Sequence, residues 1–362
     1  FKLDNLHPPG SFKLRGMGRV VQQAAQNGAG GVVSSSGGNA GIATAYAAQQ
    51  CGLQCVVVLP TSTPERTARV LERRYGATVV VHGSAWDEAN VEAQRIAAEK
   101  DWPLAHPFDD PIAWTGHASL VRECLEQLEA LGQPPPDCYV ASVGGGGLLA
   151  GIIEGVTRFH PGSGPKTKII TLETHGADCF ARSVAAGRPV TLDAITSVAK
   201  SLGALTPSAT VLRAALEDSS VLSVDTRVVS DAQAVAAAFR FANDHRHLVE
   251  PACGAALVPA YDPSLFPDDG CRNVVVEVCG GAVVDFSSLH TLALDLFDGG
   301  LDDAYDFFSS SSGVSSSIAT MVTSSSLSVP VVCRAFSVSS CPARLRSCRA
   351  TSKTSPSTGK SS

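Results

Sequence analysis

Short apolar runs alternate with helical segments along most of the chain. The runs predict strands at residues 30–35, 54–60, 78–82, 138–143, 168–173 and 273–278. Helical segments lie between them, such as the alanine-rich stretch that starts at Asn39 and stops at Gly52. Apolar runs without alternating polar positions are typical of strands buried on both faces, and intervening helices indicate a parallel sheet. The pattern therefore predicts an α/β fold.

The pattern changes at both ends of the chain. Residues 298–362 are rich in serine and then in arginine, and no acidic residue follows Asp306. Such composition lacks the periodicity of helices or strands and predicts a disordered tail. The first residue is Phe1, inside what reads as a strand, so we expect that an N-terminal part of the fold is missing.

Charge and cysteine content narrow the class of protein. The formal net charge of −6 is the balance of +6 after Asp306 and −12 before it. The strong negative charge of the chain up to Asp306 argues against nucleic-acid binding, which needs clustered Lys and Arg. The 11 cysteines contain no C-x-x-C pair, which is typical of reduced thiols in the cytoplasm. No apolar run reaches the roughly 18 residues of a membrane span. These features favour a small-molecule enzyme.

The stretch "HPPGSFKLRG" at residues 7–16 places Lys13 after two prolines, a glycine and Phe12. A lysine that reacts with carbonyl groups must lose its proton near neutral pH, so it needs an apolar or cationic environment. Phe12 supplies an apolar surface beside it. The alternative is a lysine that starts a helix with its ammonium group in water.

Two strand-to-helix turns carry candidate anion sites. The stretch "SSSGGNAG" at residues 34–41 puts hydroxyl and backbone N–H groups at a helix N-terminus, where carboxylates and phosphates bind. The alternative is an ordinary capped turn. The stretch "SVGGGGLLAG" at residues 142–151 allows the backbone to approach a phosphate closely. It also satisfies G-x-G-x-x-A, with Glu173 closing the next strand, so a nicotinamide dinucleotide remains an alternative.

The stretch "VEVCGG" ends a predicted strand at Cys279, Gly280 and Gly281. Ligands of open α/β sheets lie at the carboxyl ends of strands, so Cys279 is a candidate ligand contact. The alternative is a small buried residue of the core.

These motifs, in this order, resemble the fold-type II pyridoxal-phosphate enzymes, and among them the L-serine dehydratase/L-threonine deaminase family. The stretches "FDDPIAWTGHAS", "TSVAKSLG" and "LVEPACGAAL" add to the resemblance, which extends to about Phe297. It displaces the dinucleotide interpretation and implies two α/β domains with the cofactor in the cleft between them. The implied division is 1–10 as the start of the large domain, 11–112 as the small domain, 113–297 as the large domain and 298–362 as the tail.

The resemblance also implies site residues. Lys13 would bind pyridoxal 5′-phosphate covalently and act as the catalytic base. The cofactor would further contact Phe12 on its ring, Asn39 on its 3-hydroxyl, Gly144, Gly145, Gly146, Gly147 and Leu148 on its phosphate, and Cys279 at its nitrogen. The substrate carboxylate would contact Ser36, Gly37, Asn39 and Ala40. A monovalent cation, K⁺, would be held by Gly144, Glu173, Ala177, Cys179, Leu202 and Ala204, although a hard cation prefers oxygen to the Cys179 thiol.

The implied activity is conversion of L-serine to pyruvate and ammonia and of L-threonine to 2-oxobutanoate, by a homodimer in the cytoplasm. Racemases of this fold carry a serine at the place of Gly37, so the glycine favours a dehydratase. Two alternatives stay open: a β-replacement enzyme of the cysteine synthase type, and a cofactor-binding remnant without turnover. The expected partner is a small amino acid, with no nucleic acid and no membrane.

Overall fold

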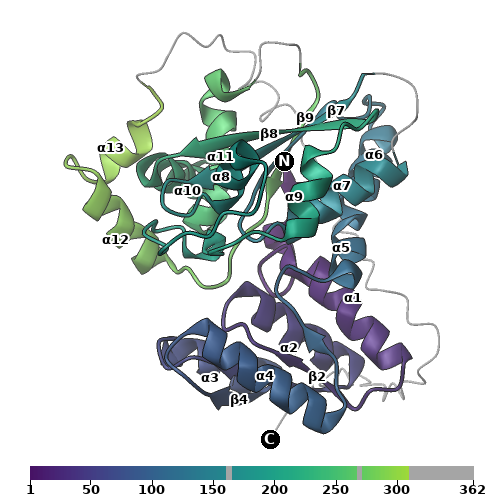
Figure 1. The fold of residues 1–362 in the computed structure, drawn as a ribbon. Coiled ribbons are helices and arrows are strands. Elements are labelled where there is room, and N and C mark those ends of the chain that lie inside the picture. Colours follow the sequence, from purple (N-terminus) through teal and green to yellow (C-terminus); the bar gives the residue numbers. More distant parts are fainter. Residues whose placement is uncertain (160–164, 267–270, 310–362) are drawn as a thin grey trace, which may run out of the picture. The chain divides into compact units, whose positions relative to one another are not determined.

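The computed structural model describes residues 1–159, 165–266 and 271–309, and its strands form two parallel sheets (Figure 1). The four-stranded sheet has the order β4-β3-β2-β5 and the five-stranded sheet the order β1-β9-β6-β7-β8. All pairings between strands are parallel, which confirms the predicted α/β class. The strands are β1 (Lys2–Leu3), β2 (Gly31–Ser34), β3 (Gln54–Leu59), β4 (Thr78–Val81), β5 (Leu104–Ala105), β6 (Cys138–Ser142), β7 (Thr167–Thr174), β8 (Leu222–Val229) and β9 (Val274–Val278).

Helices cover both faces of the four-stranded sheet. Val32 of β2 packs in a core with α1 (Lys13–Gln26), α2 (Asn39–Cys51) and α3 (Glu65–Tyr75). Its neighbour Val33 packs on the opposite face with α4 (Trp86–Lys100). Successive side chains of a strand point to opposite faces, so an uninterrupted valine run serves two cores. This sheet places the start of α2 at the carboxyl end of β2.

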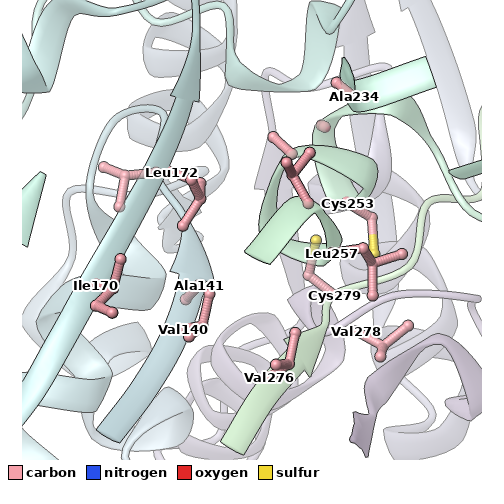
Figure 2. Packing of buried hydrophobic residues seen from close by; sticks show 14 of the residues in the cluster. Val140, Ala141, Ile170, Leu172, Ala234, Cys253, Leu257, Val276, Val278 and Cys279 are labelled. Carbon is pink, nitrogen blue, oxygen red and sulfur yellow. The ribbon is translucent and has the colours of Figure 1, made fainter. Parts of the chain in front are cut away.

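The five-stranded sheet forms the larger core. Val140 of β6, Ile170 of β7 and Val276 of β9 are buried together with Leu257 of α11 (Pro251–Tyr261; Figure 2). Gly254 lets α11 lie against α10 (Asp231–His245), since a Cβ there would meet the Ala234 carbonyl at 2.0 Å. The helices that follow α4 are α5 (Pro111–His117), α6 (Ser119–Ala130), α7 (Gly147–Phe159), α8 (Cys179–Ala186), α9 (Ala209–Leu216), α10 (Asp231–His245), α11 (Pro251–Tyr261), α12 (Phe286–Leu296) and α13 (Leu301–Asp306), with short 3₁₀ turns at Asp4–Leu6, Lys200–Leu202 and Pro263–Leu265.

The predicted start of the tail at residue 298 is too early. Helix α13 lies beyond it, and its Ala304 and the following Phe308 are buried against the larger core. Apolar contacts therefore order a segment that its composition alone had assigned to the tail. Residues 310–362 lie outside the described residues, and the domain boundaries near residues 10 and 112 stay predictions. No helix in the described ranges is long and apolar enough to cross a membrane.

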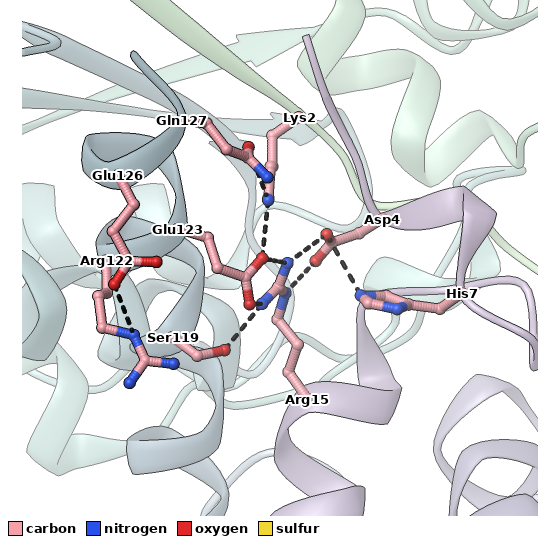
Figure 3. A network of polar contacts seen from close by, with 9 residues as sticks. All are labelled: Lys2, Asp4, His7, Arg15, Ser119, Arg122, Glu123, Glu126 and Gln127. Atoms are coloured by element: carbon pink, nitrogen blue, oxygen red, sulfur yellow. Dashed lines mark hydrogen bonds and ion pairs between the residues drawn. The ribbon is translucent and has the colours of Figure 1, made fainter. Parts of the chain in front are cut away.

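A buried ion network joins α1 to the N-terminal segment and to α6 (Figure 3). The Arg15 guanidinium donates to both carboxylate oxygens of Asp4, to Ser119 Oγ at 2.7 Å and to Glu123. Lys2 Nζ donates to the same Glu123 carboxylate at 2.7 Å. Burial alone would raise the pKa of Asp4, but the Arg15 hydrogen bonds and charge hold it well below its usual range. The network therefore holds α1 at Arg15, two residues after Lys13, the first residue of this helix.

We expect Arg15→Met to destabilise the fold by about 3–5 kcal/mol, because the change leaves the buried Asp4 carboxylate without its cation. Arg122→Met is the matched control, since Arg122 forms only an exposed i,i+4 pair with Glu126 and its loss should cost about 0.5 kcal/mol or less. Urea denaturation of the unchanged chain and of the two variants measures both losses in the free energy of unfolding. Equal losses in the two variants would contradict the role of the buried network.

Candidate active site

The segment before α1, residues 7–12, is here called the lysine strap. Its main chain pairs with the turn that follows β9: Phe12 N–H donates to the Cys279 carbonyl at 3.0 Å, and Gly281 N–H donates to the Gly10 carbonyl at 2.9 Å. Gly10 and Gly280 both have positive φ, at 82° and 86°, which side chains rarely allow. The pairing places the start of α1 at the carboxyl end of β9, where an open parallel sheet binds ligands.

Lys13 is the first residue of α1 and its side chain is half-buried. Its Nζ donates to the Pro107 carbonyl at 2.6 Å and lies 4.9 Å from the centre of the Phe12 ring. Burial lowers the pKa of Lys13 to about 8, while the nearby Cys279 acts in the opposite direction. A lysine with this pKa has an appreciable neutral fraction near pH 8 and can act as a nucleophile or a base.

The glycine loop, residues 144–147, joins β6 to α7. The N–H groups of residues 145–148 donate no backbone hydrogen bond to another described residue, so they remain available at a helix N-terminus. Gly146 has φ of 100°, and a Cβ at Gly145 would lie 2.4 Å from the Phe108 ring. Only glycine fits this turn, and its free amide donors suit a phosphate group.

Asn39 is the first residue of α2, and both ends of its amide are held. Its Oδ1 accepts from Ala282 N–H at 2.7 Å, and its Nδ2 donates to Glu250 Oε1 at 3.0 Å. These partners set the orientation of the amide, and they leave one N–H of Nδ2 for a ligand. The amide oxygen of Asn39, a predicted cofactor contact, therefore faces the turn after β9 as an acceptor, and its amide nitrogen faces Glu250 as a donor.

Glu250 is a candidate site residue that could not be recognised from the sequence. Its carboxyl group is buried just before α11 and accepts from Asn39, from the Ser201 hydroxyl and from Val283 N–H at 3.2 Å. Burial raises the pKa of Glu250, and these hydrogen bonds oppose the rise. The available signal was a single acidic residue between Val249 and Pro251 at the start of an apolar run.

The serine-rich turn before α2 is tightly folded. Ser34 Oγ accepts from Ser36 N–H at 3.4 Å, and Ser36 Oγ accepts from Gly38 N–H at 3.3 Å. A Cβ at Gly41 would lie 1.7 Å from the Ser36 carbonyl, so the helix must begin with small residues. The turn brings Ser36, Gly37, Asn39 and Ala40 to one helix N-terminus, while their contact with substrate stays a prediction.

Cys279 lies between two polar neighbours at the end of β9. Its Sγ is 3.6 Å from Ser142 Oγ, at the end of β6. The Cys253 thiol of α11 lies beside it (Figure 2), and burial together with a hydrogen bond to Cys279 raises the pKa of Cys253. Cys279 is thus buried, with its carbonyl bonded to the lysine strap and its thiol beside Ser142, the last residue of β6 before the glycine loop.

Several of the predicted cation ligands lie near one another. Cys179 Sγ donates to the Gly144 carbonyl at 3.8 Å, and a Cβ on Gly144 would lie 3.0 Å from the Leu202 carbonyl oxygen. Glu173 is buried and accepts from Phe180 N–H and Ala181 N–H at 2.9 and 2.6 Å. No cluster of three or more His, Cys, Asp or Glu side chains able to hold a metal ion occurs in the described part of the chain. A cation here would depend mainly on main-chain carbonyls, which suits a large monovalent ion.

Comparison with known proteins agrees with this geometry. Residues 1–280 match the family described as pyridoxal-phosphate dependent enzyme. A human protein named serine dehydratase-like is 45% identical over 82% of this chain and 88% of its own length. The mouse L-serine dehydratase/L-threonine deaminase is 41% identical over 83% of this chain and 91% of its own length. The crystal structure of a fungal L-serine ammonia-lyase from Rhizomucor miehei has a TM-score of 0.70 and 33% identity, covering 80% of this chain and 90% of that one.

We expect Glu250→Ala to weaken pyridoxal phosphate binding by at least ~10-fold, because Asn39 Nδ2 and Val283 N–H lose a shared buried acceptor. Glu250→Gln should stay within about 3-fold, since its amide oxygen can keep both donors and the Ser201 hydroxyl can turn to accept from its amide nitrogen. Titration of each purified chain with the cofactor measures the affinities. An unchanged affinity in Glu250→Ala would show that Asn39 needs no support.

Proposed function

The chain belongs to the pyridoxal-phosphate dependent enzymes, and from that premise we propose that its site converts L-serine to pyruvate and ammonia, and L-threonine to 2-oxobutanoate and ammonia. The observation that carries the proposal is the half-buried Lys13 amine beside the Phe12 ring, with its lowered pKa, at the carboxyl end of β9. The similarity to proteins named serine dehydratase and threonine deaminase over most of the chain supports this substrate class.

The residues present fit the cofactor. The free amide donors of Gly145, Gly146, Gly147 and Leu148 would hold its phosphate, with Gly144 preceding them. Phe12 would pack on the ring, the free N–H of Asn39 would meet the 3-hydroxyl, and the Cys279 thiol would face the ring nitrogen. When bound, the cofactor draws electrons away from the α-carbon of the substrate, which makes the proton on that carbon removable.

Lys13 would remove that proton. The neutral amine is a competent base near pH 8. The Pro107 carbonyl accepts a hydrogen bond from Lys13 Nζ and so holds the side chain in place. The β-hydroxyl would then take a proton back from the Lys13 ammonium group and leave as water. The released enamine takes up a solvent proton on its terminal carbon to become an iminium ion, to which water adds with loss of an ammonium ion, so that serine gives one keto acid and one ammonia.

The turn before α2 would hold the substrate carboxylate through Ser36, Gly37, Asn39 and Ala40. Gly37 has no side chain to serve as a second base, and a Cβ there would lie 2.9 Å from Leu59 and 3.0 Å from Thr63. The crowding on that side supports elimination over racemisation, because a serine could enter only if its neighbours moved.

We also propose a K⁺ site at Gly144, Glu173, Ala177, Leu202 and Ala204. Proximity of Gly144 to Leu202 and the buried carboxyl group of Glu173, which a neighbouring cation would help to ionise, support it. Cys179 donates its thiol hydrogen to the Gly144 carbonyl, so it would act as a neighbour of the site and a weak ligand at most. The small domain would span residues 11–112 and the large domain residues 113–297, with the site between their sheets.

The expected setting is the cytoplasm, with the chain as a homodimer. The cysteines that the structure describes are free thiols, which supports a reducing compartment. Size-exclusion chromatography with light scattering measures the oligomeric state directly.

We expect the purified chain with pyridoxal phosphate and K⁺ to release keto acid from L-serine and L-threonine, and Lys13→Ala to lose this release by ~10³-fold or more. The assay couples pyruvate to lactate formation. A cofactor absorption band without keto acid would favour a cofactor-binding remnant without turnover. If adding sulfide then gave a sulfur-containing amino acid, the chain would be a β-replacement enzyme. If neither band nor product appears, the chain does not bind the cofactor and the proposal is wrong.

We expect K⁺ to stabilise the chain more at pH 8.5 than at pH 6. Burial raises the pKa of Glu173 to about 8, so between pH 4.5 and 8 the folded chain keeps a proton that the unfolded chain has released. Stability contributed by this group therefore falls as pH rises through that window, and a cation beside the carboxylate offsets the loss. Thermal midpoints in potassium and tetramethylammonium chloride measure the difference.

Glu173→Gln should abolish both the K⁺ effect and this part of the pH dependence. Glu154→Gln, on the surface of α7, is the matched control and should change neither. A K⁺ effect that survives in Glu173→Gln would place the cation elsewhere.

A further inference from the structure

His117 is a buried polar residue that the proposed reaction does not use. It is the last residue of α5, its side chain is 0% exposed, and neither ring nitrogen finds a hydrogen-bond partner among the described residues. Burying an imidazole without a hydrogen-bond partner lowers the free energy of unfolding, so some other contact must compensate for it.

The ring fills a notch in the helix that carries Lys13. The three heavy atoms nearest to a Cβ on Gly16 of α1 would all belong to the His117 ring, with Nε2 at 2.4 Å and Cε1 at 2.7 Å. Gly16 is therefore needed because the imidazole occupies the space that any side chain would take.

The same residue lies against the helix that begins at the glycine loop. A Cβ on Gly151 of α7 would lie 2.2 Å from His117 Cβ and 3.0 Å from Ala118 N. Lys13 is the first residue of α1 and Gly147 is the first residue of α7. His117 thus touches both helices that start at the site.

The ring also supports the residue next to Lys13. The centres of the His117 and Phe12 rings are 5.2 Å apart, and Lys13 Nζ lies 4.9 Å from the centre of the Phe12 ring. Displacing the imidazole would free Phe12 to move and would let more water reach the amine.

We propose that His117 is a positioning residue, which locks the lysine-bearing helix α1 to the glycine-loop helix α7 through the Gly16 notch and keeps the Phe12 ring over the Lys13 amine. This role rests on the proposed function, because it assumes that the amine and the glycine loop serve one cofactor. The ring acts by its shape and not by its charge. Burial, together with the charges of Lys13 and Arg15, lowers the pKa of His117 to about 3, so the ring is neutral at working pH.

The test is a double-mutant cycle between Gly16→Ala and His117→Ala. Each single variant should weaken pyridoxal phosphate binding by ~10-fold or more, the first by displacing the ring and the second by leaving a cavity. The double variant should bind no worse than either single one, because the added methyl group then occupies space that the ring has left. Gly18→Ala is the matched control on the same helix, where a Cβ meets only Leu14 at 3.6 Å, and should bind within about 2-fold of the unchanged chain.

A second readout does not need the cofactor. The rate of acetylation of Lys13, followed by mass spectrometry against pH in the cofactor-free chain, reports the pKa of its amine. His117→Ala should move this midpoint upward from about 8, because water reaches the ammonium group. Leu71→Ala, a large-to-small change in the core of the four-stranded sheet, should lower the urea midpoint without moving the midpoint of Lys13.

The outcomes separate this proposal from the proposed function. Additive losses in the cycle, or an unchanged Lys13 midpoint in His117→Ala, would overturn the role of His117 even if the enzyme turns over serine. If the unchanged chain releases no keto acid, the activity is wrong, but the acetylation midpoints still decide whether His117 positions the lysine.

Discussion

The main-chain pairing between the lysine strap and the turn after β9 is the constraint on which the site depends. Main-chain hydrogen bonds join Phe12 to Cys279 and Gly281 to Gly10, although more than 260 residues separate the members of each pair in the sequence. Backbone hydrogen bonds of this kind specify position without requiring particular side chains, apart from glycines where φ is positive. Once the strap is held there, Lys13 begins α1 at the carboxyl end of β9, and its amine donates to the Pro107 carbonyl beside the Phe12 ring.

Close approach of helices organises the surroundings of that lysine. Gly16, Gly151 and Gly254 each lie where a Cβ would meet a neighbour at 2.4 Å or less. Such contacts leave little freedom for one element to shift alone, because packed interiors have almost no spare volume. The ion network around Arg15 adds a polar anchor to the same helix. The amine of Lys13 is thus positioned by packing on one side and by buried charges on the other.

Much of the fold and of the site could be predicted from local signals. The valine-rich runs led to the parallel strands, and glycines after β6 indicated a loop for a phosphate. Glu250 was missed because it is one carboxylate in an apolar stretch, and its importance lies in partners from two distant segments, Asn39 and Val283. Helix α13 was missed because it is ordered by contacts with the larger core and not by its own composition.

The sequence by itself determined the α/β fold class and made Lys13 and the glycines of residues 144–147 candidate site residues, because these predictions need only apolar periodicity, local chemistry and backbone freedom. The tertiary structure decided which groups act together: the Pro107 carbonyl on Lys13, the Glu250 carboxylate on Asn39, and His117 against Gly16. The physical reason is that burial and hydrogen bonding between distant segments depend on packing in three dimensions, which neither composition nor spacing encodes in a readable way.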